Sequence, residues 1–147
     1  MIYAIAMALA LLLATTGLHF EGLRLTYRGV LGLGGSNRRK VVLAMLCVFF
    51  VHLAEIALYA AAYWFADQVI DIGGFAGPHV SAPGASFYFF FSAQTYTTLG
   101  LGDVYPTGPL RLLASIEPIN GLLLLGWSAS LTYYLMQRFW EQDRRGL

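Results

Sequence analysis

The sequence predicts an all-α membrane protein, and two observations support this fold class. Hydrophobic residues make up 58% of the 147-residue chain and charged residues only 12%, whereas about a quarter of the residues in soluble domains are charged. Three apolar stretches are also long enough to cross a membrane, because a helix of about 20 residues spans a hydrocarbon core about 30 Å thick. A fourth apolar run, residues 87–96, is too short to span and requires another explanation.

Each of the three long stretches contains few charged or histidine side chains. Residues 1–18 contain no acidic or basic side chain, residues 41–66 contain one histidine and one glutamate, and residues 112–136 contain a single glutamate. The first stretch lacks the basic start and the clear small-residue cleavage site of a signal peptide. We therefore expect it to be retained as a helix that packs outside the second helix and faces lipid.

The distribution of basic residues predicts the orientation of the chain in the membrane. Basic residues near the ends of membrane helices mark the cytoplasmic side. They are concentrated in residues 24–40 and in the C-terminal tail, whereas residues 67–111 contain only Arg111. We expect a multi-pass protein of the cell (plasma or inner) membrane with its N-terminus outside and its C-terminus in the cytoplasm. A net charge of +1 provides no basic field for nucleic acid.

Residues 86–97 are predicted to form a short helix that enters the membrane from outside and stops partway. Ser86 is a suitable N-cap, and the run is long enough for about three helical turns. The chain must then return as non-helical backbone, which a membrane tolerates only where it is buried in protein or lines a wet path. The returning segment, residues 98–103, is Thr-Leu-Gly-Leu-Gly-Asp.

This segment suits the binding of a dehydrated monovalent cation. Such an ion needs oxygen ligands in place of its water, and a ring of backbone carbonyls from several chains can supply them. Aligning successive carbonyls requires residues with positive φ, which Gly100 and Gly102 adopt at little cost. Leu99 and Leu101 can pack outward against the short helix, and Thr98 adds a hydroxyl at the inner end.

The same residues resemble a known family. Residues 95–106 read Thr-Tyr-Thr-Thr-Leu-Gly-Leu-Gly-Asp-Val-Tyr-Pro, which is similar to the signature of the potassium-channel pore domain. The resemblance implies a homotetramer embedded in lipid that conducts K⁺ passively, with no organic cofactor and no enzymatic activity. It also implies that the ion sites are formed by the filter residues Thr98, Leu99, Gly100, Leu101 and Gly102.

The resemblance divides the chain into a pore domain and flanking segments. Residues 1–23 form an extra N-terminal transmembrane helix, residues 24–40 a basic cytoplasmic linker, residues 41–140 the pore domain and residues 139–147 a short tail. Within the pore domain we expect an outer helix (41–66), an extracellular turret (67–85), a pore helix (86–97), the filter (98–103) and an inner helix (110–138).

Filter support is expected from three further residues: Gln94, Thr97 and Asp103. Family members commonly have an aromatic residue at the position of Leu101, and some have an acid at the position of Gln94. Leucine has no hydroxyl to tie the filter to the pore helix, so the sequence leaves open a cation channel that does not discriminate K⁺ from Na⁺. A membrane scaffold that does not conduct is a further alternative.

Several polar or helix-breaking residues in the spanning segments have no assigned role. Glu117 could be hydrogen-bonded behind the filter, for example to pore-helix hydroxyls, or could attract cations or sense protons. Pro118, Gly121 and Gly126 could mark a hinge or a packing contact.

A histidine and a glutamate in the second stretch also stand out. His52 and Glu55 are spaced i, i+3 on one helix face, which suits a buried hydrogen-bond network or a metal or proton site. His19 and Glu21 could pair with other helices. His79, in the turret, could titrate near neutral pH.

Overall fold

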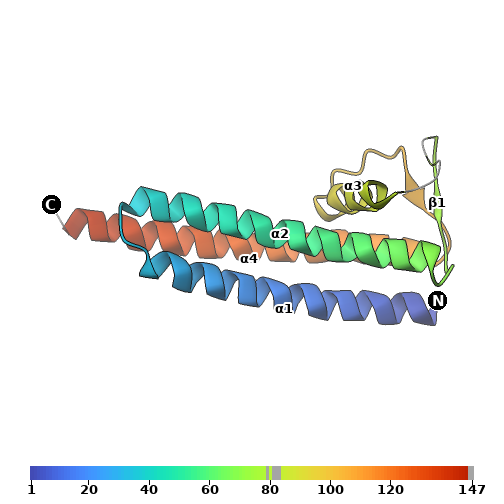
Figure 1. Cartoon of the computed structure of the whole chain (residues 1–147), viewed down its shortest axis with the longest axis horizontal. Helices are drawn as coiled ribbons and strands as arrows, with labels where there is room; N and C mark the ends of the chain where they lie inside the picture. The colour runs from blue at the N-terminus through green and yellow to red at the C-terminus, as the bar shows by residue number, and fades with distance from the viewer. Residues whose placement is uncertain (79, 81–83, 146–147) are drawn as a thin grey trace.

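The computed structural model describes residues 1–78, 80 and 84–145, and His79 lies outside them. It contains three long helices, with a short helix and a small β-ladder near one end of the bundle (Figure 1). In chain order the elements are α1 (Ile2–Gly32), α2 (Asn37–Gln68), β1 (Phe75–Ala76), α3 (Ala85–Tyr96), β2 (Tyr105–Pro106) and α4 (Leu110–Arg145).

The three long helices confirm the predicted class of an all-α membrane protein. Within the described residues, α1, α2 and the Leu110–Glu141 part of α4 are long and apolar enough to cross a membrane. Their outward faces carry many exposed apolar side chains, such as Leu13, Phe50 and Leu123. A soluble protein would bury such faces, whereas lipid or neighbouring subunits can cover them.

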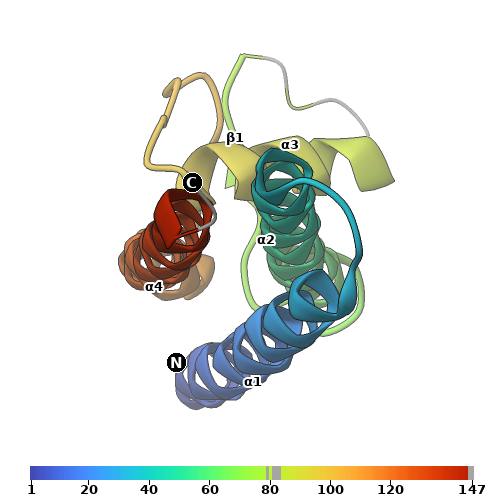
Figure 2. The same ribbon diagram turned by 90° about the vertical axis from the view of Figure 1, so that its left-hand side faces the viewer.

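The first helix was predicted to pack outside the second helix and face lipid, but it packs against two helices. α1 contacts both α2 and α4, and α3 lies across α2 on the side opposite α1 (Figures 1 and 2). The close approach of α1 to α2 depends on Gly22, where an added Cβ would lie 2.5 Å from a methyl group of Val51. α1 is therefore part of the core of the subunit.

The basic segment predicted as a linker over residues 24–40 is mostly helical. α1 continues to Gly32 and α2 begins at Asn37, so only residues 33–36 connect them. Packing explains the difference: Val30 is buried in a small cluster with Ala44, Leu135 and Phe139 at this end of the bundle. Such burial outweighs the low helix propensity of the glycines in this stretch.

The other boundaries differ by smaller amounts. α3 begins at Ala85 after Gly84, so Ser86 lies inside the helix rather than at its N-cap. α4 continues to Arg145, through most of the segment predicted as a tail. The turret contains β1, whose Phe75 pairs with Pro106 and whose Ala76 pairs with Tyr105 in an antiparallel ladder. This ladder connects the turret to the segment that follows the filter.

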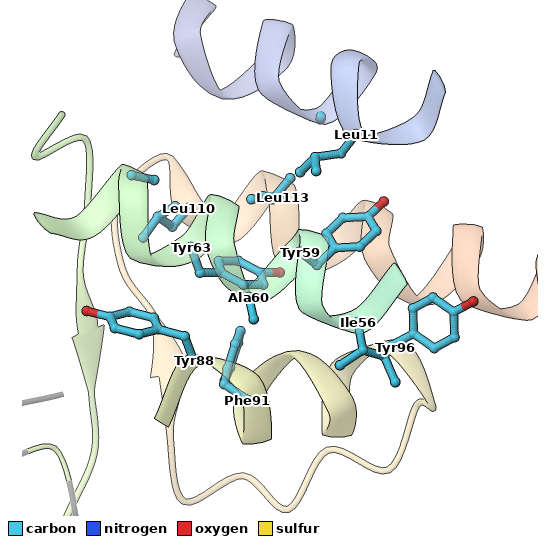
Figure 3. Close-up of a cluster of buried hydrophobic side chains, with 12 residues drawn as sticks. Leu11, Ile56, Tyr59, Ala60, Tyr63, Tyr88, Phe91, Tyr96, Leu110 and Leu113 are labelled. Carbon is cyan, nitrogen blue, oxygen red and sulfur yellow. The ribbon is translucent and has the colours of Figure 1, made fainter. Parts of the chain in front are cut away.

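The main hydrophobic core lies where α1, α2, α3 and α4 meet. Tyr59 and Tyr63 of α2 are fully buried among Leu11, Phe91 and Leu113 from the other helices (Figure 3). The rings of Tyr59, Tyr63 and Phe91 contribute apolar surface to this core. The two tyrosine hydroxyls, in contrast, need hydrogen-bond partners inside the bundle. The core therefore contains several buried hydrogen-bonding groups close to the predicted filter.

Candidate functional site

The predicted filter begins at the C-terminal end of α3. The helix stops at Tyr96, and the next backbone N–H groups turn back to carbonyls of its last turn. The N–H of Leu99 donates to the carbonyl of Gln94 at 2.8 Å, and the N–H of Gly100 approaches the same oxygen at 3.3 Å. Two successive N–H groups thus face α3, so the carbonyls on the opposite edge of this segment face away from it.

The backbone of residues 98–102, here called the filter segment, alternates in handedness. Thr98, Gly100 and Gly102 have φ values of +62°, +48° and +80°, whereas Leu99 and Leu101 keep negative φ. Alternating right- and left-handed residues turn successive N–H groups to one side of the strand and therefore turn the carbonyls to the other. Left-handed φ is unfavourable for β-branched Thr98. Positive φ at Gly100 and Gly102 is the backbone geometry that the sequence predicted for aligning successive carbonyls.

The filter segment is largely open in a single chain. Leu99 and Leu101 are each 65% exposed. The predicted packing of these two leucines against the pore helix is therefore not seen within their own chain. Within the described residues, no N–H or side-chain donor bonds to the carbonyls of residues 98–102. Such a row of carbonyls, held in a chain that spans a membrane, requires partners from outside the chain.

Two of the predicted support residues line one groove without touching. Gln94 of α3 and Asp103 after the filter both border a groove with Phe87, Phe90 and Val104. Within the described residues, no hydrogen bond joins the Gln94 and Asp103 side chains. The backbone of Asp103 instead lies close to the turret, where an added Cβ at Gly77 would be 2.0 Å from its carbonyl oxygen.

Two threonines near the end of α3 bond to their own helix. The Thr97 hydroxyl donates to the carbonyl of Ala93 at 2.7 Å, and that of Thr95 donates to the carbonyl of Phe91 at 2.8 Å. The Ala93 carbonyl also accepts the Thr97 backbone N–H at 3.2 Å, so the Thr97 hydroxyl adds a second bond to the same oxygen. Thr97 therefore contributes to the connection between the helix and the filter from its helical side.

Glu117 lies behind α3, in contact with a pore-helix hydroxyl. Its carboxylate is fully buried and accepts hydrogen bonds from Ser92 at 2.5 Å and from Tyr63 at 2.6 Å. Ser92 also lies 2.9 Å from the carbonyl of Ile56. These contacts correspond to the structural alternative that the sequence analysis raised for Glu117. They join α2, α3 and α4 directly behind the pore helix.

Of the residues predicted as hinge or packing positions, Gly121 makes the closest contact. An added Cβ there would lie 2.4 Å from the carbonyl oxygen of Tyr96, at the end of α3. Gly126 has open space around it, and Pro118 lies inside α4. Gly121 thus allows the inner helix to approach the base of the filter.

His52 and Glu55 belong to a larger buried group that we call the Glu55 cluster, formed by His19, His52, Glu55, Tyr96 and Ser128. Nδ1 of His19 lies 2.7 Å from Oε1 of Glu55, and Nδ1 of His52 lies 3.0 Å from Oε2. The Tyr96 hydroxyl donates to Oε2 at 2.5 Å. On the far side of the rings, Ser128 Oγ lies 2.9 Å from Nε2 of His52 and 3.4 Å from Nε2 of His19.

A metal ion does not fit this geometry well. The three ligand-type side chains place their donor atoms within 4.8 Å of one another. However, ligands bound to a tetrahedral metal at about 2.0–2.1 Å lie about 3.3 Å apart, and the contacts of Glu55 with His19 and His52 are shorter, at 2.7 and 3.0 Å. These are hydrogen-bond distances. The i, i+3 pair is therefore part of a hydrogen-bond network rather than a metal pair.

The predicted pairing of His19 with another helix is present, but the roles of Tyr96 and Ser128 in the Glu55 cluster were not predicted. The role of Asn120 was not predicted either; its side-chain amide donates to Thr15 at 2.7 Å and lies 3.0 Å from the Tyr59 hydroxyl. Serine, threonine and tyrosine are common in membrane helices, and nothing in their spacing indicated these pairings. Only the arrangement of α1 against α2 and α4 brings them together.

A polar contact also closes the outer end of α3. The Tyr88 hydroxyl donates to Asp67 at 2.5 Å and accepts from Gln68 at 3.1 Å. Burial, together with the neighbouring Asp67 carboxylate, raises the pKa of Tyr88 to about 12. The hydroxyl therefore stays protonated at neutral pH and holds α3 to the end of α2.

Comparison with known proteins identifies the class to which this fold and site belong. A family model described as "Ion channel" matches residues 41–139, more than half of the chain. The chain therefore belongs to this ion channel family, and it is a membrane protein of that family. The match begins within α2 and covers most of α2, α3, the filter segment and most of α4.

A curated relative gives a more particular similarity. The chain is 38% identical over 86 residues to the inward rectifier potassium channel Kirbac3.1 of Paramagnetospirillum magnetotacticum. The aligned region covers 56% of this chain but only 26% of the relative, so the chain spans about a quarter of that protein. No solved structure matches the chain at a significant level. These findings confirm the resemblance to a channel pore domain drawn from the sequence.

Proposed function

We propose that this chain is one subunit of a homotetrameric potassium channel, with its ion sites in the filter segment. The observation that carries the proposal is the alternation of left- and right-handed residues over residues 98–102. It turns a row of carbonyl oxygens away from α3, and these oxygens have no donor within the described chain. A row of this kind replaces the hydration shell of K⁺ when several chains surround one axis.

The assembly follows from the exposure of the filter segment. One chain contributes one strand of carbonyls, and four chains form the ring that K⁺ channels use. The exposed side chains of Leu99 and Leu101 would then be covered by neighbouring subunits rather than by α3 of their own chain. The relative is named as a potassium channel, which supports K⁺ as the permeant ion.

The electrostatics behind the filter also favour a cation. The C-terminal end of α3 carries about half a negative charge from its aligned peptide dipoles, and the filter segment starts there. Asp103 at the outer end and Gln94 on α3 border one groove. We propose that they support the filter through contacts that form in the tetramer. The protein then lowers the cost of dehydrating K⁺ and carries out no covalent chemistry.

We also propose the orientation that the charges predict. The α1–α2 connection and the C-terminal end of α4 lie at the same end of the bundle, opposite the N-terminus, β1 and β2 (Figure 1). The basic residues Arg38, Arg39 and Lys40 are at that end. Their positions support a cytoplasmic location for it, with the filter entered from outside the cell.

A channel that does not discriminate K⁺ from Na⁺ is the second candidate. Leu101 has no side-chain hydrogen bond to hold the filter, and it is 65% exposed in the single chain. Selectivity depends on how many carbonyls coordinate the ion and how firmly they are held, so a loosely held filter would pass both ions.

Ion flux through the purified protein in liposomes separates these functions. Vesicles are loaded with K⁺ or with Na⁺, and efflux is measured under equal gradients. We expect rapid K⁺ efflux with little Na⁺ efflux. Equal fluxes would support the nonselective channel. Absence of flux under either gradient, together with absence of K⁺ binding, would support a scaffold and contradict the proposal.

A further inference from the structure

The hydrogens of the Glu55 cluster can be assigned from its contacts. An ionised carboxylate only accepts hydrogen bonds, and Glu55 faces Nδ1 of His19 at 2.7 Å and Nδ1 of His52 at 3.0 Å. A bare Nδ1 would place its lone pair against the carboxylate oxygen. Each ring therefore carries a hydrogen on Nδ1. The Tyr96 hydroxyl also approaches Nδ1 of His52 at 2.9 Å, but its single hydrogen is directed to Glu55.

Ser128 then determines how many protons the two rings hold. Its hydroxyl has one hydrogen to donate, and it lies between Nε2 of His52 at 2.9 Å and Nε2 of His19 at 3.4 Å. If both rings were neutral, both Nε2 atoms would be acceptors and one would lack a donor. If one ring carries a second proton, it donates to Ser128 and Ser128 donates to the other ring. With Glu55 ionised, both contacts are satisfied only in that state.

Counting charge gives the same answer. The described residues include no lysine or arginine paired with Glu55, and its ion-pair partners are the two histidines. Glu55 and His19 are fully buried, where an uncompensated charge is costly. One imidazolium neutralises one carboxylate, whereas two neutral rings leave a net negative charge and two imidazolium rings leave a net positive one.

The other titratable groups near the cluster do not change this count. Outside the cluster they are Tyr59 on α2 and Glu117 on α4, which is engaged by Ser92 and Tyr63, and within it Tyr96 on α3. α1 contributes His19 to the cluster, and the α4 groups that face it are the neutral side chains of Ser128 and Trp127.

The cluster is mechanically connected to the base of the filter. Tyr96 is the last residue of α3, and its carbonyl oxygen is packed against Gly121 of α4. The chain reaches Thr98, the first residue of the filter segment, two positions later. Because Tyr96 is held by Glu55 on one side and by α4 on the other, a change in the cluster changes the support of residues 97–99.

We propose that the Glu55 cluster is a proton-binding site that positions the inner end of the filter, and that His19 and His52 share one proton through Ser128. This inference rests on the proposed channel function. Loss of the shared proton leaves Glu55 without a counter-charge, and a second proton gives the cluster a net positive charge. Either change loosens the hold on Tyr96, so K⁺ flux should depend on pH through this site.

Nitrogen NMR of the full-length protein in lipid, with isotope-labelled histidine, tests the proton count without measuring flux. We expect both Nδ1 atoms of His19 and His52 to be protonated at neutral pH, with a single proton distributed over their two Nε2 atoms. The proposal would be overturned if Nδ1 of either ring carried no proton, or if neither Nε2 atom carried one. This result holds whether or not the protein conducts K⁺, so it is independent of the proposed function.

The pH dependence of K⁺ flux in liposomes tests the connection to the filter. The wild-type profile is compared with those of Ser128→Ala, which removes the bridging hydroxyl, and Ser128→Thr, which keeps it. We expect Ser128→Ala to lower the midpoint for releasing the shared proton by about one pH unit, a tenfold loss in proton affinity. Ser128→Thr should restore the wild-type profile. Identical profiles for all three proteins would overturn the positioning role, and absence of wild-type flux at every pH would contradict the channel function instead.

Discussion

The filter segment and the Glu55 cluster are two groups of polar atoms joined by residues 96–98. They differ in where their hydrogen-bond partners come from. The carbonyls of residues 98–102 have no donors in the described chain and lie beside exposed leucines. In the Glu55 cluster, by contrast, every polar atom has a partner within 3.4 Å from α1, α2, α3 or α4. The polar atoms of the cluster are paired within one chain, whereas the carbonyls of the filter segment are not.

This difference suggests that one part of the chain binds the ion and another part holds the ligands in place. A channel must bind its ion weakly enough to release it, so its ligands should be held by something other than the ion. The polar residues behind the filter provide this support, because they connect four helices through buried hydrogen bonds. α1 lies outside the region matched by the family model, yet it provides His19 and Thr15 to this support.

The largest effect is expected from Gly100→Ala. Gly100 has a φ of +48°, and a side chain there costs about 1–2 kcal/mol per chain, or several times that in a tetramer. We expect K⁺ flux in liposomes to fall more than about 100-fold, since each 1.4 kcal/mol is a factor of ten. Gly17→Ala is the matched control, because Gly17 is on α1 with open space around it. Normal flux in Gly100→Ala would show that ions do not pass along residues 98–102.

Removing Glu55 should affect the folding of each subunit instead. Glu55→Leu leaves the donors of His19, His52 and Tyr96 unpaired in a buried site, and breaking a buried ion pair costs about 3–5 kcal/mol. The expected result is a loss of this size in the free energy of unfolding in detergent micelles. Glu21→Gln is the control, because its pair with Arg24 is exposed and is worth about 0.5 kcal/mol or less. Equal, small losses for both variants would mean that the cluster contributes no more than a surface pair.

The contact between the two regions can be tested at Gly121. Gly121→Ala places a Cβ 2.4 Å from the Tyr96 carbonyl, and forcing a methyl group into such a packed site costs about 1–3 kcal/mol. We expect lower thermal stability together with altered flux, because the end of α3 must move. Gly126→Ala, in open space on the same helix, should be neutral or stabilising by up to about 1 kcal/mol. If Gly126→Ala reduces flux more than Gly121→Ala, the packing of Gly121 against Tyr96 does not control the filter.

A smaller loss of stability than that of Glu55→Leu is expected at the second buried carboxylate, Glu117. Tyr63→Phe removes one of the two side-chain donors to Glu117 and should cost about 1–3 kcal/mol in the free energy of unfolding. Tyr3→Phe is the control, since Tyr3 is 68% exposed. A loss no larger than that of Tyr3→Phe would indicate that Ser92 alone satisfies Glu117.

The sequence predicted the filter better than it predicted the support behind it. Gly100 and Gly102 lie in one short motif whose glycine spacing has a direct backbone consequence, and the structure shows positive φ at both. The positive φ of Thr98 was not predicted. The spanning helices were predictable because the length of an apolar run is a local property. The ends of α1 and α4 were not, because burial of Val30 and Phe139 against other helices extends them.

The support residues could not be paired from the sequence for a similar reason. His19 and Glu55 are separated by 36 positions, and Thr15 and Asn120 by 105. Pairing them requires knowing which faces of α1, α2 and α4 meet. Hydropathy places a helix in the membrane but does not determine its rotation, which depends on packing against neighbours. The structure supplied that rotation, and with it the Glu55 cluster.

The central claim is that the carbonyls of residues 98–102 select K⁺, and the reversal potential of the reconstituted protein tests it most directly. Currents are recorded across a planar bilayer with K⁺ on one side and an equal concentration of Na⁺ on the other. We predict a reversal potential displaced strongly in the direction of K⁺ permeation, and loss of the current in Gly100→Ala. A reversal potential near zero would mean that the pore does not distinguish the two ions, and would contradict the claim.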